Sequence, residues 1–143
     1  MADQDVVLVT GASGFIGSAV IDRLAGKYTI VGLDRPGSPA PDPAVAVDFD
    51  LGSDEAVRAS LETVRERFGS RIASVIHLAA YYDITGDPNP LYEKITVQGT
   101  RRLIEALKSF EVEQFVFAST LLVHEPTETL DGRIDENSPI APS

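Results

Sequence analysis

Three glycines near the start of the chain have the spacing of a phosphate-binding loop. Gly11, Gly14 and Gly17 follow an apolar run at residues 6–9 and open a segment with helical periodicity. In that context Gly11 permits a tight turn, Gly14 lets a pyrophosphate approach the backbone, and Gly17 lets the helix pack closely on the sheet. The free amides at the helix start, aided by the helix dipole, would bind the phosphates. A P-loop is excluded because no Gly-Lys-Ser/Thr follows. A glycine-rich turn without a ligand is the alternative interpretation.

An acidic residue ends the next apolar run along the chain. Asp34 follows residues 29–33, at the distance after the glycines where a carboxylate accepts hydrogen bonds from both hydroxyls of an adenosine ribose. A carboxylate there repels a 2′-phosphate, so Asp34 favours NAD over NADP. The neighbouring Arg35 could instead stack on adenine or bind a phosphate, which keeps NADP as the less favoured alternative.

The elements that must position these residues alternate between strands and helices. Five apolar runs predict buried strands: residues 6–9, 29–33, 44–47, 74–77 and 114–118. Three segments predict helices: residues 15–25, 54–68 and 91–110. This alternation predicts one α/β domain, a doubly wound parallel sheet of the Rossmann type with strand order 3-2-1-4-5. Ser53 is expected to cap the second helix, and Ile16, Val20 and Leu24 are expected to face inward from the first.

Composition excludes several classes of function. The net charge of −10 argues against nucleic-acid binding, which usually requires a basic surface. The chain has no cysteine and only two histidines, so neither a disulfide nor a structural zinc site is expected. No apolar run is long enough to span a membrane, and the polar, acidic start does not have the pattern of a signal peptide. A cytoplasmic protein that binds a small-molecule substrate is therefore expected.

Five segments together resemble the extended short-chain dehydrogenase/reductase family, the NAD-dependent epimerase/dehydratase type. In chain order they are Thr10-Gly11-x-x-Gly14-x-x-Gly17, Asp50-Leu51, His77-Leu78-Ala79-Ala80, Val97-Gln98-Gly99-Thr100 and Phe115-Val116-Phe117-Ala118-Ser119-Thr120. Because they occur in the family's order and cover the whole chain, chance agreement is excluded as their explanation. The fold is shared by many chemistries, so the reaction class rests on this resemblance.

The resemblance implies a role for each motif. The Asp50 carboxylate would bond the amino group of adenine, and the backbone of Leu78, Ala79 and Ala80 would line the ribose on the nicotinamide side. Thr120, with Ser119 as the second choice, would bond the substrate oxygen at the carbon that exchanges hydride. Thr96 stands where the family usually has an asparagine that supports helix and backbone. The residues expected at the cofactor are Gly11, Ser13, Gly14, Phe15, Ile16, Gly17, Asp34, Arg35, Asp50, Leu51, Leu78, Ala79, Ala80 and Thr96.

The family's catalytic Tyr-x-x-x-Lys pair is not present. None of the four tyrosines is followed by a lysine four positions later. We therefore expect residues 1–143 to be an NAD(P)-binding Rossmann domain, cut before the last strands and without a substrate domain. The fifth strand would then be an open edge, available to a second copy or to a complementing fragment.

Two functions remain open at this point. The first is the NAD-binding portion of an epimerase, a dehydratase or an alcohol dehydrogenase, acting on a hydroxyl or keto group, with a sugar nucleotide as the favoured substrate. The second is a catalytically inactive protein that senses nicotinamide nucleotides or binds a partner. Thr120, at the position of the catalytic hydroxyl, favours the first.

Overall fold

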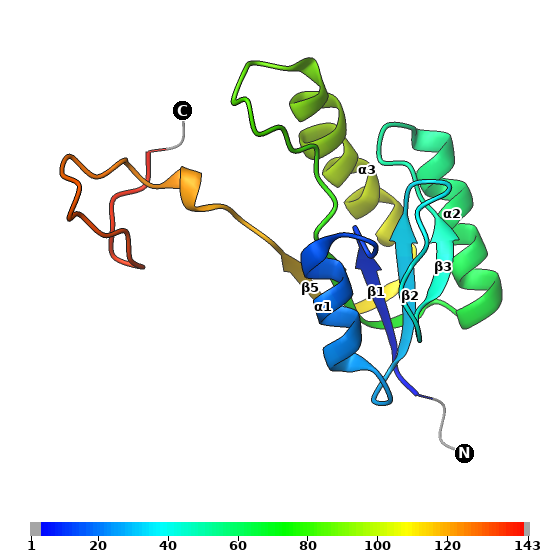
Figure 1. Cartoon of the computed structure of the whole chain (residues 1–143). Helices are drawn as coiled ribbons and strands as arrows, with labels where there is room; N and C mark the ends of the chain where they lie inside the picture. Colours follow the sequence, from blue (N-terminus) through cyan, green and yellow to red (C-terminus); the bar gives the residue numbers. More distant parts are fainter. Residues whose placement is uncertain (1–3, 142–143) are drawn as a thin grey trace.

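The computed structural model, which describes residues 4–141, confirms a doubly wound parallel sheet. Five strands pair in the order β3-β2-β1-β4-β5, as expected from the sequence. The strands are β1 (Val6–Thr10), β2 (Thr29–Asp34), β3 (Val45–Asp48), β4 (Arg71–His77) and β5 (Glu111–Phe117). The main helices are α1 (Phe15–Leu24), α2 (Asp54–Phe68) and α3 (Gln98–Leu107). Figure 1 shows the strands side by side with these helices around them.

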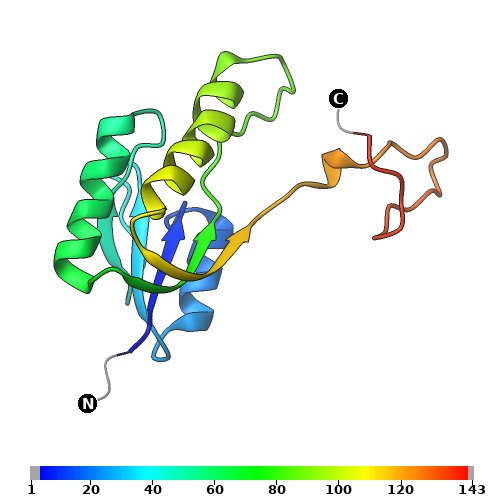
Figure 2. The same cartoon turned by 180° about the vertical axis from the view of Figure 1, so that it is seen from behind.

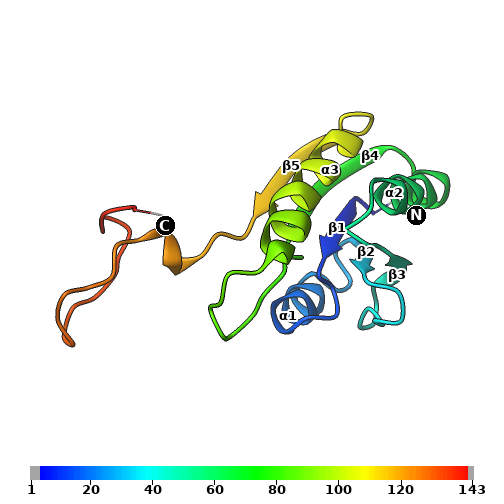
Figure 3. The same ribbon diagram turned by 90° about the horizontal axis from the view of Figure 1, so that it is seen from above.

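The helices cover the two faces of the sheet separately. On one face, Val57 and Leu61 of α2 and Leu103 of α3 pack with Leu8 and Val31 of the central strands. On the other face, Ile21 of α1 packs with Val7, Val9 and Ile30. Figure 3 shows α1 on the side of the sheet opposite α2 and α3. Alternate residues of β1 therefore point into different cores, which explains why that strand is apolar throughout.

The strand register places the functional ends together. Thr10 pairs with Leu33 of β2 and with His77 of β4, and His77 pairs with Phe117 of β5. The carboxyl ends of the strands therefore meet at one edge of the sheet, where parallel α/β proteins bind their ligands.

The inward face of α1 differs from the sequence prediction. Ile16 is 59% exposed, so its predicted inward position is wrong, whereas Gly17 and Ile21 are buried. Val20 and Leu24 are half-buried, as that prediction required. The difference arises because Gly17 has no side chain and lies directly against the loop backbone. This contact turns the helix so that Ile16 projects into solvent.

The third predicted helix is interrupted at its start. Tyr92–Val97 forms a π-helix, η1, and the α-helix begins only at Gln98. A π-helix inserts one residue into the turn, and apolar periodicity does not reveal that insertion. Two strands also begin earlier than predicted, at Arg71 and Glu111, because their polar first residues pair across the sheet.

The segment after β5 leaves the sheet. It contains a short 3₁₀ helix, η2 (Leu121–Val123), and closes on itself through a bridge between His124 and Ile140. Figures 1 and 2 show it extending away from the strands and helices. Among residues 4–141, no helix is long and apolar enough to cross a membrane.

Candidate cofactor site

The glycine loop between β1 and α1 is built for close backbone contact. Gly11 has a φ of 70° and its amide donates to the Leu33 carbonyl at 2.9 Å. A Cβ atom on Gly17 would lie 2.2 Å from the Gly11 carbonyl oxygen, so only glycine fits there. Gly14 is the N-cap of helix α1 and supplies no side-chain cap. Within residues 4–141, the amides of Phe15 and Ile16 donate to no backbone carbonyl, which leaves them free for an anion.

Asp34 lies at the end of β2 and is held against this loop. Its Oδ2 accepts hydrogen bonds from the Ser13 amide at 2.9 Å and from the Ser13 hydroxyl at 2.6 Å. Its Oδ1 accepts from the Arg35 amide at 2.8 Å. Partial burial raises the pKa of Asp34, but these hydrogen bonds and the Arg35 charge outweigh it and hold the pKa below 3.8. The group is therefore a carboxylate at neutral pH.

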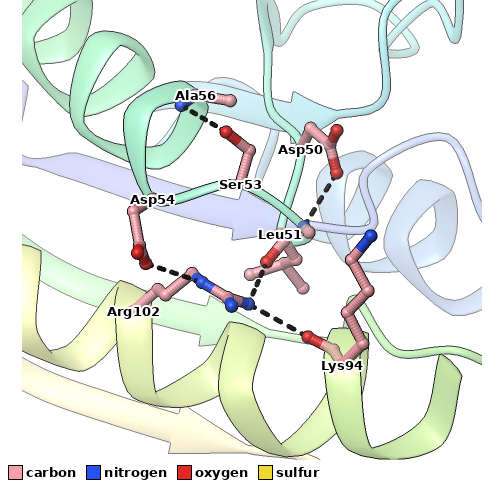
Figure 4. A network of polar contacts seen from close by, with 8 residues as sticks. Asp50, Leu51, Ser53, Asp54, Ala56, Lys94 and Arg102 are labelled. Atoms are coloured by element: carbon pink, nitrogen blue, oxygen red, sulfur yellow. Dashed lines mark hydrogen bonds and ion pairs between the residues drawn. The ribbon is translucent and has the colours of Figure 1, made fainter. Parts of the chain in front are cut away.

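The turn between β3 and α2 presents a second carboxylate. Asp50 is exposed, and its Oδ1 accepts a hydrogen bond from the Gly52 amide at 2.8 Å. The next side chain, Leu51, is 5% exposed and belongs to the core formed with α2 and α3. In Figure 4 the Asp50 side chain and the Leu51 carbonyl lie on opposite sides of this turn.

The segment after β4 is fixed by two threonines. The amides of Leu78 and Ala79 donate to Thr10 Oγ1 at 3.1 and 3.0 Å. Two residues further on, the Tyr81 amide donates to Thr96 Oγ1 at 3.0 Å. Thr96 therefore supports the backbone that follows Ala80, although a threonine stands where the resemblance leads one to expect asparagine.

The buried His77 connects Thr10 to Thr96 through the hydroxyl of Thr100. The sequence motifs did not reveal this connection. The Thr100 hydroxyl donates to the Thr96 carbonyl at 2.6 Å, so Thr100 Oγ1 must accept from His77 Nε2 at 2.9 Å. His77 Nδ1 then carries no proton and accepts from the Thr10 hydroxyl at 2.7 Å. Burial lowers the pKa of His77 to about 4, which keeps the ring neutral. One feature of the sequence does point to this network: Thr10 is a polar residue at the end of an otherwise apolar strand.

Tyrosines order the loop that follows. Asn89 donates to the Tyr81 hydroxyl at 3.0 Å, and the rings of Tyr81 and Tyr92 meet edge to face with centroids 4.9 Å apart. The neighbouring Tyr82 side chain is 80% exposed. Tyr81, Tyr82 and Asn89 lie between the cofactor-side segment and η1, whose first residue is Tyr92.

The two candidate catalytic hydroxyls follow the last strand. The Ala118 amide donates to the His77 carbonyl at 3.3 Å, so Ser119 and Thr120 lie just beyond the paired part of β5. Both are exposed, and Thr120 Oγ1 accepts from the Leu122 amide at 3.2 Å as the cap of η2. In the described part of the chain, neither bonds another candidate site residue. The structure brings together the glycine loop, Asp34 and the Leu78–Ala79 backbone, and it leaves this pair apart from them.

The chain matches one protein family over most of its length. Residues 7–143 match the model of the NAD dependent epimerase/dehydratase family. A putative UDP-glucose 4-epimerase of Methanocaldococcus jannaschii is 28% identical over 152 aligned residues, which cover 96% of this chain and 45% of that protein. The chain thus spans about half the length of the curated relatives it matches.

Two solved structures share the fold. UDP-glucose 4-epimerase of Thermus thermophilus, in complex with NAD, superposes with a TM-score of 0.75 and 30% identity, covering 96% of this chain and 44% of that one. A short-chain dehydrogenase/reductase superfamily protein of Agrobacterium tumefaciens with bound NAD gives a TM-score of 0.73 and 29% identity, covering 96% and 39%. The family description and these NAD-bound structures confirm the prediction of NAD as the cofactor.

Proposed function

Since this chain belongs to the NAD-dependent epimerase/dehydratase family, we propose that it forms the NAD-binding part of an enzyme acting on a hydroxyl or keto group. The favoured substrate class is a sugar nucleotide. Relatives described as UDP-glucose 4-epimerases support that class. In this function the candidate residues other than Ser119 and Thr120 bind the cofactor.

The observation that carries the proposal is the fixed carboxylate of Asp34. Three donors hold it at the end of β2, beside the glycine loop. A charged group there can accept from both ribose hydroxyls, and it repels a 2′-phosphate. Hydrogen bonds to a charged acceptor contribute about 1.5–3 kcal/mol each, which is enough to select NAD.

The glycine loop supplies the phosphate half of the site. Without a Cβ on Gly14, the exposed backbone at the start of α1 is open to a close approach. The amides of Phe15 and Ile16 would donate to the pyrophosphate, and the helix dipole adds a positive potential there. Replacement of Gly17 would push the loop away from α1, so the same glycines that build the turn also shape the binding surface.

Bound NAD would supply a hydride acceptor and donor for a secondary alcohol. The Leu78–Ala80 backbone would line its nicotinamide-side ribose, and Thr96 would hold the following backbone through the Tyr81 amide. Thr120 or Ser119 would donate a hydrogen bond to the substrate oxygen. The motif Tyr-x-x-x-Lys does not occur in these 143 residues, so we assign binding but not turnover to this chain by itself.

Calorimetric titration with NAD⁺ and, separately, with NADP⁺ tests the proposal. We expect saturable binding of NAD⁺ and binding of NADP⁺ that is at least about tenfold weaker, a difference of about 1.4 kcal/mol. Equal affinity for both dinucleotides would contradict the role of Asp34. If a folded sample bound neither, the proposed function of this chain would be wrong.

A further inference from the structure

One arginine joins three separate segments beside the Asp50 turn. Arg102 projects from α3, and its side chain is 22% exposed. Its Nε donates to Asp54 Oδ1 at 2.6 Å, and its Nη1 donates to the carbonyls of Leu51 and Lys94, each at 3.0 Å. Figure 4 shows the guanidinium between the β3–α2 turn, the first turn of α2 and the helix that carries Lys94.

These contacts fix the residue next to the exposed carboxylate. The Leu51 side chain is buried in the core, and a Cβ on Gly99 would lie 2.8 Å from Leu51 Cβ. Helix α3 therefore touches Leu51 at its side chain, and Arg102 bonds it at its carbonyl. Asp50 is held on the other side of the turn by the Gly52 amide, through Oδ1 alone. The orientation of its remaining oxygen depends on how firmly the Leu51 backbone is held.

We propose that Arg102 is a positioning residue for recognition of the adenine base. By holding the Leu51 carbonyl against η1 and α2, it sets the direction of the Asp50 carboxylate. Asp50 can then accept a hydrogen bond from the amino group of adenine. This inference rests on the proposed function and on the contact between Asp50 and the adenine amino group that the family resemblance implies.

The geometry requires a guanidinium. Arginine has a planar fork of donors that can bond two carbonyls and a carboxylate at once, whereas a lysine ammonium is a single point charge. If the fork is removed, the carbonyls of Leu51 and Lys94 lose their side-chain donor and Asp54 loses its ion pair. The turn would then be held by the Leu51 side chain and by the amides of Gly52 and Ser53, which donate to Asp50. The direction of the Asp50 carboxylate would be fixed less firmly.

The test is base discrimination, which a general loss of stability does not change. Nicotinamide hypoxanthine dinucleotide has an oxo group in place of the adenine amino group and a proton on the neighbouring ring nitrogen, N1. An oxo group cannot donate to a carboxylate, so the wild-type chain should bind NAD⁺ more tightly. The ratio of the two dissociation constants, measured by calorimetry, reports on recognition of this edge of the base. The part of the ratio that is lost in Asp50→Ala is the part that depends on Asp50.

Arg102→Met keeps the aliphatic stem and removes the fork. We expect it to lower the preference for NAD⁺ about fivefold to tenfold, which is less than the full effect of losing a hydrogen bond to a charged group, because Asp50 itself remains. Arg102→Lys should lower the preference less, because a cation remains beside Asp54. The matched control is Arg101→Met, one position earlier on α3, since the exposed Arg101 side chain makes no hydrogen bond or ion pair with any residue among 4–141.

The outcomes separate the two proposals. A reduced ratio in Arg102→Met, with Arg101→Met at the wild-type ratio, supports the inference. An unchanged ratio in a folded Arg102→Met chain that still binds NAD⁺ overturns the inference and leaves the proposed function intact. Arg102→Lys carries the same test if the methionine variant does not fold. A wild-type chain that binds neither dinucleotide overturns the proposed function, and the inference with it.

Discussion

The carboxylate of Asp34 bonds both the glycine loop and the backbone that follows β2. Ser13 occupies one of its oxygens and Arg35 the other, with further acceptor positions left on each. Arg35 is exposed, and its amide rather than its guanidinium makes the hydrogen bond. The residue therefore combines a fixed orientation with a negative charge, and these are the two properties that ribose recognition requires.

Replacement of this carboxylate should change selectivity as well as affinity. We expect Asp34→Ala to weaken NAD⁺ binding by roughly 2 kcal/mol, about thirtyfold, through the loss of hydrogen bonds to a charged acceptor. NADP⁺ should lose less, because the repulsion of its phosphate disappears. Calorimetry with both dinucleotides measures the two changes, and Asp22→Ala on the exposed side of α1 is the control. Unchanged selectivity would contradict the assignment to ribose.

The pKa of Asp34 leads to a further expectation. Because it lies below 3.8 in the folded chain, the group is fully ionised throughout the neutral range. The preference for NAD⁺ over NADP⁺ that arises from Asp34 should therefore be the same at about pH 6 and about pH 8, apart from ionisation of the NADP⁺ phosphate itself. Parallel titrations at the two pH values check this.

The buried His77 makes the free energy of unfolding depend on pH in the mildly acidic range. Burial lowers its pKa from 6.5 to about 4, so the unfolded chain binds a proton below pH 6.5 that the folded chain does not. Stability is therefore complete above pH 6.5 and is lost as the pH falls toward 4. Between pH 7 and pH 5 we expect a loss of about 2 kcal/mol from this group. Urea unfolding at the two pH values measures it.

The matched comparison uses the two histidines of the chain. His77→Gln should remove most of this pH dependence, whereas His124→Gln should retain it, because His124 lies outside the sheet in the segment after β5. If His77→Gln and the wild type lost the same stability between pH 7 and pH 5, the neutral, buried state of His77 would be wrong.

At the scale of elements, α2 is the helix whose sequence and structure agree best. The sequence predicts that Ser53 caps a helix at 54–68, and its hydroxyl accepts from the Ala56 amide at 3.2 Å. Acidic Asp54 and Glu55 occupy the first turn, where the helix dipole favours them. Local chemistry decides such a boundary, and for this reason it could be read from the sequence.

Ser53→Ala should therefore destabilise the chain by about 1 kcal/mol, the usual effect of losing an N-cap. The reason is that the Ala56 amide at the start of α2 would lose its side-chain acceptor. Urea unfolding of the variant at neutral pH measures the change. Ser70→Ala, an exposed serine outside any helix, is the control and should be within about 0.5 kcal/mol of wild type. Equal stability of all three chains would show that the cap contributes nothing.

Other features of the elements could not be read from the sequence, because individual hydrogen bonds and close backbone contacts decide them. The π-helix at Tyr92–Val97 has its Lys94 carbonyl bonded by Arg102 and its Thr96 carbonyl bonded by Thr100. The exposure of Ile16 follows from the contact between Gly17 and the Gly11 carbonyl. Apolar periodicity predicts which segments are helical, but it does not report which carbonyl a side chain bonds or where two stretches of backbone touch.

For the whole molecule, the sheet topology could be predicted and the complete site could not. Continuous apolar strands alternating with helices allow few arrangements, and the glycine motif fixed which strand edge binds the ligand. The positions of Ser119 and Thr120 relative to the glycine loop depend on what packs beside β5. In this chain β5 is paired with β4 alone, so nothing within residues 4–141 holds the pair over the cofactor site.

The free side of β5 leads to the last prediction. Phe115, Val116 and Phe117 are between 37% and 55% exposed, although they belong to a strand. An edge strand with unpaired backbone groups and apolar side chains readily pairs with another chain. We therefore expect this chain to self-associate as its concentration rises, which sedimentation velocity over a concentration series would show.

A charge on that edge should oppose the pairing. Val116→Lys places an ammonium on β5, and two such edges repel each other and resist burial. We expect the variant to stay monomeric at concentrations where the wild-type chain associates. The control is Ile104→Lys, which adds the same charge at a 43% exposed position on α3. If both variants associated as the wild type does, the contact would not be at β5; if Ile104→Lys alone were monomeric, the contact would instead involve α3.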